Sequence, residues 1–137
     1  MDRLPPDVRV LIIDAHAGMR RGLHSLLDST EDLRWVGEAL DLADGLKSAS
    51  RLEPDVTIVD FGAAQKFGFD DLGGHLSAHS WIVMSDYPNA SKLYKAIASG
   101  AYGGFLKLSP ASEILSIVRA CGSLATREGR GSRDASL

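Results

Sequence analysis

The chain alternates short apolar segments with longer segments of helical periodicity, and this alternation constrains the fold more than any other feature. The five apolar segments are VRVLII (8–13), RWVGEA (34–39), VTIV (56–59), WIVM (81–84) and GGFL (103–106). Three of them are almost wholly apolar, which is typical of strands buried on both faces of a parallel sheet. Strands that alternate with helices predict an α/β fold, here an open, doubly wound sheet of five parallel strands in the order 2-1-3-4-5.

The segments between the strands carry apolar residues on one helical face. The clearest stripes are Met19, Leu23, Leu26 and Leu27; then Leu42, Leu46 and Ala49; then Leu93 and Ile97; then Ile114, Leu115, Ile117, Val118 and Cys121. The weakest predicted helix is 70–79, because Gly73 and Gly74 each cost about 1 kcal/mol relative to alanine.

Length and charge exclude several classes of function. A chain of 137 residues predicts one domain. The net charge of -3 does not suit a surface that itself coats nucleic acid. A single cysteine excludes an internal disulfide and a multi-cysteine metal site. No signal peptide or membrane-spanning run is present, so we expect a cytoplasmic protein with no membrane partner. The polar, aperiodic segment 125–137 predicts a flexible tail after a domain over 1–124.

Four polar residues end the predicted strands. Asp14 follows the first strand, Asp60 the third, Ser85 the fourth and Lys107 the fifth. In an open parallel sheet, ligands bind at the carboxyl ends of the strands, where the strand order reverses. The order 2-1-3-4-5 makes the first and third strands neighbours, so we expect Asp14 and Asp60 to lie close together. Each residue alone suits a cap, a turn or a solvated surface, and only the set of four indicates a site.

These residues and their surroundings resemble the receiver domain of bacterial two-component response regulators, most closely the NarL/LuxR type. The likeness lies in VRVLIIDAHAGMRRGLHSLL, VGEA, PDVTIVD and SGAYGGFLKLSPASEIL, and runs from about residue 8 to residue 124. It implies a flavodoxin-like fold and a regulatory rather than enzymatic role. It also implies Asp60 as phosphoryl acceptor, Ser85 and Lys107 as phosphoryl contacts, and Asp14 with Asp60 as Mg²⁺ ligands.

The chain departs from the family pattern at several of these positions. Ala15 stands where the family has a second acid, and a methyl group cannot coordinate Mg²⁺. Gly104 replaces the aromatic switch residue, and Ala63-Ala64 replaces a Met-Pro pair. Asp86 follows Ser85, where the family has a small residue. Asp86 is interpreted either as a turn residue or as a built-in partner that holds Lys107 as a phosphoryl group would.

The resemblance with these departures predicts an atypical receiver that is not switched by conventional aspartyl phosphorylation. We expect a homodimer, with Tyr94, Ala98 and Tyr102 as candidate surface residues. The tail would join a C-terminal helix-turn-helix domain, the only route to DNA. Two alternatives stay open: a weakly Mg²⁺-dependent receiver in which Asp60 accepts phosphate from a sensor kinase, and a pseudo-receiver that senses a small ligand. A phosphatase or nucleotide-binding enzyme is disfavoured, because DAHAGM lacks a glycine-rich phosphate cradle.

Overall fold

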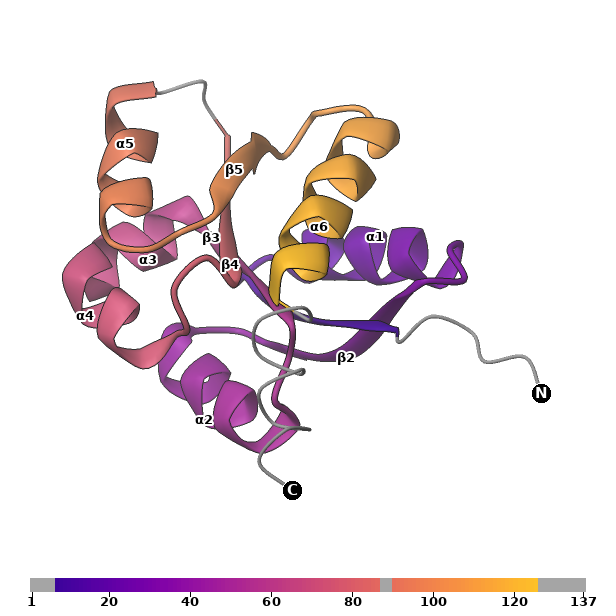
Figure 1. Ribbon diagram of the computed structural model, residues 1–137, viewed down its shortest axis with the longest axis horizontal. Helices are drawn as coiled ribbons and strands as arrows, with labels where there is room; N and C mark the ends of the chain where they lie inside the picture. The colour runs from indigo at the N-terminus through magenta and orange to yellow at the C-terminus, as the bar shows by residue number, and fades with distance from the viewer. Residues whose placement is uncertain (1–6, 87–89, 126–137) are drawn as a thin grey trace.

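The computed structural model describes residues 7–86 and 90–125 and shows one parallel sheet with helices on both sides (Figure 1). The strands are β1 (Val8–Ile13), β2 (Leu33–Ala39), β3 (Val56–Asp60), β4 (Trp81–Ser85) and β5 (Gly103–Leu106). The helices are α1 (Ala17–Asp28), α2 (Leu42–Leu52), α3 (Phe61–Phe67), α4 (Phe69–His75), α5 (Ala90–Ala98) and α6 (Ala111–Ala125). The sheet order is β2-β1-β3-β4-β5, which confirms the predicted topology.

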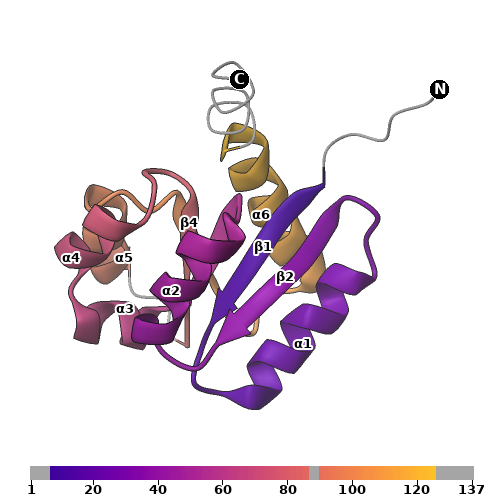
Figure 2. The ribbon, with the colours of Figure 1, turned by 90° about the horizontal axis from the view of Figure 1, so that it is seen from below.

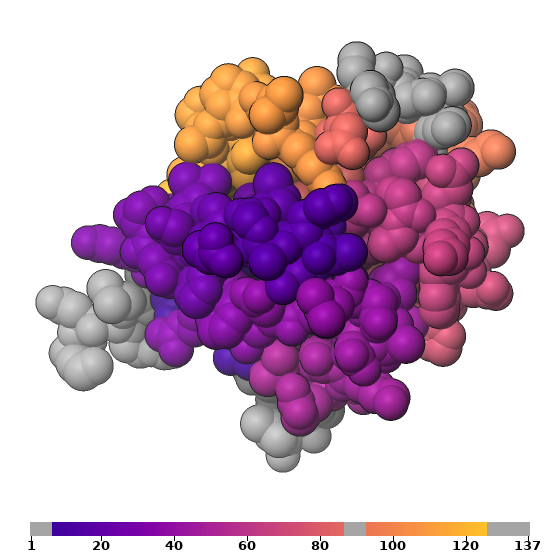
Figure 3. All heavy atoms as spheres, turned by 180° about the vertical axis from the view of Figure 1, so that it is seen from behind, coloured from indigo at the N-terminus to yellow at the C-terminus, as the bar shows by residue number. Residues whose placement is uncertain are grey.

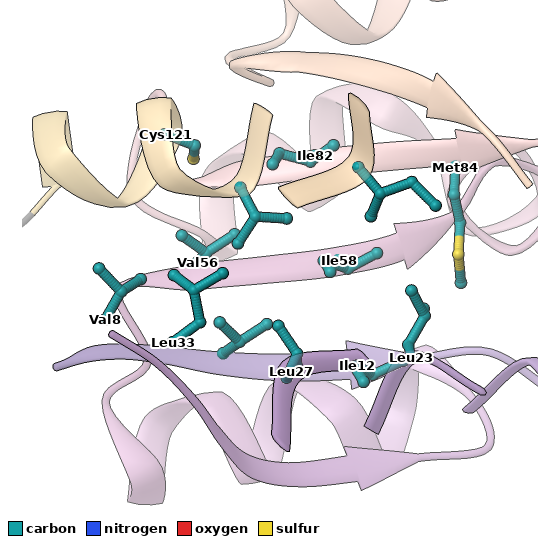
Figure 4. Packing of buried hydrophobic residues seen from close by; sticks show 13 residues of the cluster. Val8, Ile12, Leu23, Leu27, Leu33, Val56, Ile58, Ile82, Met84 and Cys121 are labelled. Carbon is teal, nitrogen blue, oxygen red and sulfur yellow. The ribbon is translucent and has the colours of Figure 1, made fainter. Parts of the chain in front are cut away.

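The two faces of the sheet are covered by different helices, as Figure 2 shows for α1 and α2 on opposite sides of β1 and β2. Helices α1 and α6 pack on one face through Leu23, Leu27 and Val118 (Figure 4). Helices α2 to α5 cover the other face. β1, β3 and β4 are buried almost throughout, because both of their faces meet helices.

The core on the α1 and α6 side is closely packed and apolar. Val10, Ile12, Ile58 and Met84 have no exposed surface, and side chains of this kind contribute roughly 1.5–3 kcal/mol each when fully buried. Cys121 lies in the same cluster. Burial raises the pKa of its thiol to about 12, so this group stays protonated and unreactive at neutral pH.

Two glycines let helices approach β5 from both sides. A Cβ at Gly103 would lie 3.3 Å from Cδ1 of Ile117 in α6. A Cβ at Gly104 would lie 2.8 Å from Cδ1 of Leu93 in α5 and 2.9 Å from the carbonyl oxygen of Val83. No side chain fits at Gly104 without movement of α5 or of β4. The aromatic residue that the resemblance leads us to expect at this position would therefore not fit in this packing.

The segment between β3 and β4 differs from the prediction. The helix expected over 70–79 is present but shorter, as α4 over Phe69–His75, and an additional helix, α3, precedes it and meets it at Gly68, which has a φ of 107°. Helix α3 forms directly after β3 because the Asp60 carboxylate accepts a hydrogen bond from the backbone N–H of Ala63 at 3.0 Å. Ala63 and Ala64, both strong helix formers, extend that first turn.

The carboxyl-terminal helix α6 is described as far as Ala125. The predicted tail 125–137 therefore begins inside α6, and its remainder lies outside the described residues. Within the part of the chain that is described, no helix is long and apolar enough to cross a membrane.

Candidate functional site

Asp14 lies at the carboxyl end of β1 and has no exposed surface. It sits beside Asp60 because Ile13 pairs with Val59 in the parallel register of β1 and β3. Its Oδ1 accepts hydrogen bonds from the backbone N–H of His16 at 3.2 Å and lies 3.1 Å from His16 Nδ1. Its Oδ2 lies 3.3 Å from Lys107 Nζ, an ion pair without the angles of a hydrogen bond. A buried carboxylate thus depends on a lysine from β5.

Lys107 brings the acids together. Its Nζ donates to Asp60 Oδ1 at 2.8 Å and faces Asp14 Oδ2, and its side chain is 10% exposed. Burial alone would lower the pKa of Lys107, but the hydrogen bond and charge of Asp60, followed by the charge of Asp14, outweigh burial. The pKa of the ammonium therefore lies above its usual value, and Lys107 is charged at neutral pH.

Asp60 uses both of its oxygens within the chain. Oδ1 accepts from Lys107, and Oδ2 accepts from the N–H of Ala63 at the start of α3. The same residue that ends β3 therefore begins the next helix. Its side chain keeps 20% of its surface exposed, so the carboxylate is held in place and still faces solvent.

Ser85 and Asp86 arrive from β4. Ser85 is the last residue of β4, and its carbonyl accepts from the N–H of Lys107 at 2.8 Å, which ties the ends of β4 and β5 together. Asp86 is 64% exposed, and its Oδ1 lies 4.0 Å from Lys107 Nζ, at the limit of an ion pair. Lys107 is held by Asp60 and Asp14 at closer range than by Asp86.

Figure 3 shows the face on which these strand ends meet. Indigo atoms that follow β1 lie at the centre, next to the magenta region of α3 and the orange connection between β5 and α6. The four positions singled out in the sequence therefore come from separate parts of the chain and converge on one edge of the sheet, as expected for the strand order.

Two residues at this edge were not among the predicted site residues. Arg20 on α1 donates from Nη1 to the carbonyl oxygen of Asp14 at 2.6 Å and from Nε to Glu38 Oε2 at 2.7 Å. His16 begins α1, as the sequence indicates, but its ring also contacts Asp14. His16 is two residues from Asp14, a spacing visible in the sequence. Nothing in the sequence pairs Arg20 with Glu38, which is 18 residues away.

The residues present do not make a conventional Mg²⁺ site. Every oxygen of Asp14 and Asp60 lies within 3.3 Å of a donor from the chain itself. Ala15 adds only an exposed methyl group. Across residues 7–86 and 90–125 no three metal-binding side chains are gathered as a group. Mg²⁺ favours near-octahedral oxygen ligation, and here, among the described residues, the one positive charge next to both acids comes from Lys107.

Comparison with known proteins points to one family. No family model matches the chain. LiaR, a transcriptional regulatory protein of Bacillus subtilis, is 34% identical over 116 residues, covering 82% of this chain and 55% of LiaR. NarP, a nitrate/nitrite response regulator of Escherichia coli, is 32% identical over 116 residues, covering 82% of this chain and 54% of NarP. The chain therefore spans about half the length of these curated relatives.

A solved structure agrees with the sequence matches. The signal receiver domain of the putative response regulator NarL from Mycobacterium tuberculosis superposes with a TM-score of 0.71 at 26% identity, covering 87% of this chain and 98% of that one. The sequence matches and the matching fold together show that the chain belongs to the response regulators of the NarL/LuxR type, as a receiver domain.

Proposed function

We propose that this chain is the regulatory module of a transcriptional response regulator and that conventional aspartyl phosphorylation does not switch it. The observation that carries the proposal is Ala15, which adds only an exposed methyl group beside the two acids, Asp14 and Asp60, that Lys107 contacts. Phosphoryl transfer to an aspartate needs charge neutralisation on the incoming group, which a divalent cation normally provides. Ala15 removes one ligand for that cation.

The chain also lacks a side chain at residue 104 that could transmit phosphorylation of Asp60 to α5. Leu93 of α5 occupies the space that a side chain at residue 104 would need. An event at Asp60 therefore has no side chain at this position through which to move α5. Loss of a metal ligand and loss of the switch side chain both favour a module that acts in a single conformation.

The experiment is intact-mass spectrometry after incubation with Mg²⁺ and a small acyl phosphate. We expect no added phosphoryl group on the wild-type chain. Ala15→Asp, at an exposed position that accepts a larger side chain, restores the missing ligand and should gain one phosphoryl group. Ala15→Asp/Asp60→Asn should lose that gain.

Two results would overturn this proposal. Phosphorylation of the wild-type chain that Asp60→Asn abolishes would return it to a Mg²⁺-dependent receiver in which Asp60 accepts phosphate. Failure of Ala15→Asp to gain a phosphoryl group, with its fold verified by circular dichroism, would show that Ala15 is not the deciding change.

The partners proposed for the module are a second copy of the chain and a DNA-binding domain that follows it. The matches cover only 55% of LiaR and 54% of NarP, and the uncovered remainder of these regulators supports an effector beyond residue 137. Tyr94 is 75% exposed and Ile97 44% exposed on α5, and both suit a pairing surface. Tyr102, also predicted there, instead packs against the core. Tyr94→Asp should shift a dimer to monomer in light scattering, and an unchanged mass would exclude this surface.

A further inference from the structure

A hollow of about 430 Å³ lies at the carboxyl end of β2. Lys107, Asp14 and Asp60 do not line it, although Arg20 in its wall donates to the carbonyl oxygen of Asp14. Its walls come from Arg20 on α1, from Glu38 and Leu40 at the end of β2, and from Lys47, Ser48 and Arg51 on α2. On the face shown in Figure 3, the indigo atoms of α1 lie beside the purple atoms of the segment from β2 to α2.

The charges of this hollow are not balanced. Arg20 and Glu38 neutralise each other at 2.7 Å. Asp44 is then the one remaining acid in the lining, and it faces two remaining cations, Lys47 and Arg51. Neither of these two cations forms an ion pair with any described residue, and the hollow therefore carries an excess of positive charge.

The spacing of Lys47 and Arg51 lowers the stability of α2. Lys47 and Arg51 are four residues apart on α2, so both project from the same face. Like charges at this spacing repel each other and destabilise a helix. An anion bound between them would remove the repulsion and gain charge-assisted hydrogen bonds from both, with the Ser48 hydroxyl as a further donor.

The hollow also has an apolar wall. Leu40 is 56% exposed at its rim, one of few large apolar side chains that face solvent. A bound molecule that covers Leu40 would remove this apolar surface from water. We propose that the hollow binds a small oxyanion, a phosphate or carboxylate, attached to a short apolar group. This site does not involve Asp60 and is independent of whether Asp60 is phosphorylated.

The test is a titration of the isotope-labelled chain by two-dimensional ¹H–¹⁵N NMR at constant ionic strength. One arm uses inorganic phosphate and a second uses phenyl phosphate. We expect saturable shifts confined to amides around Arg20 and of residues 38–51 in both arms, with phenyl phosphate several-fold tighter because it reaches Leu40. Equal affinity in the two arms would overturn the apolar part of the proposal.

A matched pair of double variants tests whether the charges of Lys47 and Arg51 bind the anion. Lys47→Ala/Arg51→Ala should weaken binding about tenfold or more. The control Arg21→Ala/Lys66→Ala removes the same charge from exposed positions outside the hollow and should leave affinity within about twofold. Glu38→Gln should tighten binding, because it removes a carboxylate from the wall. Linear, non-saturating shifts, equal losses in both double variants, or weaker binding by Glu38→Gln would each overturn the site.

Discussion

At the carboxyl edge of the sheet, the acids that end β1 and β3 contact Lys107, which follows β5, whereas within β5 Gly104 has no side chain and α5 packs directly against it. Lys107 contacts Asp60 at 2.8 Å and Asp14 at 3.3 Å. Three residues earlier, a Cβ at Gly104 would lie 2.8 Å from Leu93. The stability of the first region depends on the balance of charge between its side chains. The stability of the second depends on how much side-chain volume fits between β5 and α5.

This difference predicts how each region responds to change. The stability of the cluster formed by Asp14, Asp60 and Lys107, called here the acid–lysine cluster, is sensitive to pH and to substitutions that alter charge. A buried carboxylate needs a cation beside it. The contact between β5 and α5 is sensitive to added atoms, because close-packed interiors resist extra volume. Substitutions of one kind should therefore have little effect in the other region.

The largest effect is expected from Lys107→Met. It leaves Asp14, which has no exposed surface, without its cation. Breaking a fully buried pair costs about 3–5 kcal/mol, and the partial exposure of Lys107 and Asp60 reduces this to about 2–3 kcal/mol of unfolding free energy. Denaturant unfolding measures the loss. Lys66→Met, at an exposed lysine on α3, is the control and should change stability by less than about 0.5 kcal/mol.

The second largest effect is expected from Gly104→Ala. The new methyl group would press on Leu93 and on the backbone of Val83, and overpacking of this kind costs about 1–3 kcal/mol. Gly22→Ala on α1 is the control, because a Cβ there has nothing within 4 Å. Gly22→Ala should stabilise the chain by about 0.5–1 kcal/mol. A stable Gly104→Ala variant would show that α5 can move away from β5.

The pH dependence of the acid–lysine cluster follows from the raised pKa of Lys107. The stability that it contributes is fully present below the ordinary lysine pKa of 10.5 and is lost as pH rises through the higher folded-state pKa. Unfolding midpoints of the wild-type chain and Lys107→Met, measured from about pH 9 to about pH 12, should therefore converge at the alkaline end. A constant difference across this range would contradict the assignment.

The smallest effect is expected at the surface, where Arg119 on α6 donates to both oxygens of Asp32 at 2.8 and 3.0 Å. The hydrogen bond from Arg119 holds the pKa of Asp32 below its usual 3.8. The stability that the Asp32–Arg119 pair contributes is fully present above pH 3.8 and is lost as pH falls through the lower folded-state pKa of Asp32. Asp32→Asn should cost less than about 1 kcal/mol at pH 7, because both side chains are 46% exposed. A larger loss would mean that this pair holds α6 in place.

The residue pattern alone determined the fold class and most of the site. Apolar runs located the five strands, and their order placed Asp14, Asp60 and Lys107 at one edge, as the structure has them. These predictions succeeded because strand burial depends on local composition and because parallel strands end at the same edge of a sheet.

Only the tertiary structure decided which side chains take which partners. The Asp60 carboxylate could begin α3, a helix the pattern did not indicate, because Ala63 follows it at capping distance. Arg20 reaches both Asp14 and Glu38, and Leu93 fills the space beside Gly104. Lys47 and Arg51 line a hollow beside Leu40 and form no ion pair with any described residue. Local periodicity reports which face of an element is buried, whereas these contacts depend on the distance and angle between elements that only packing sets.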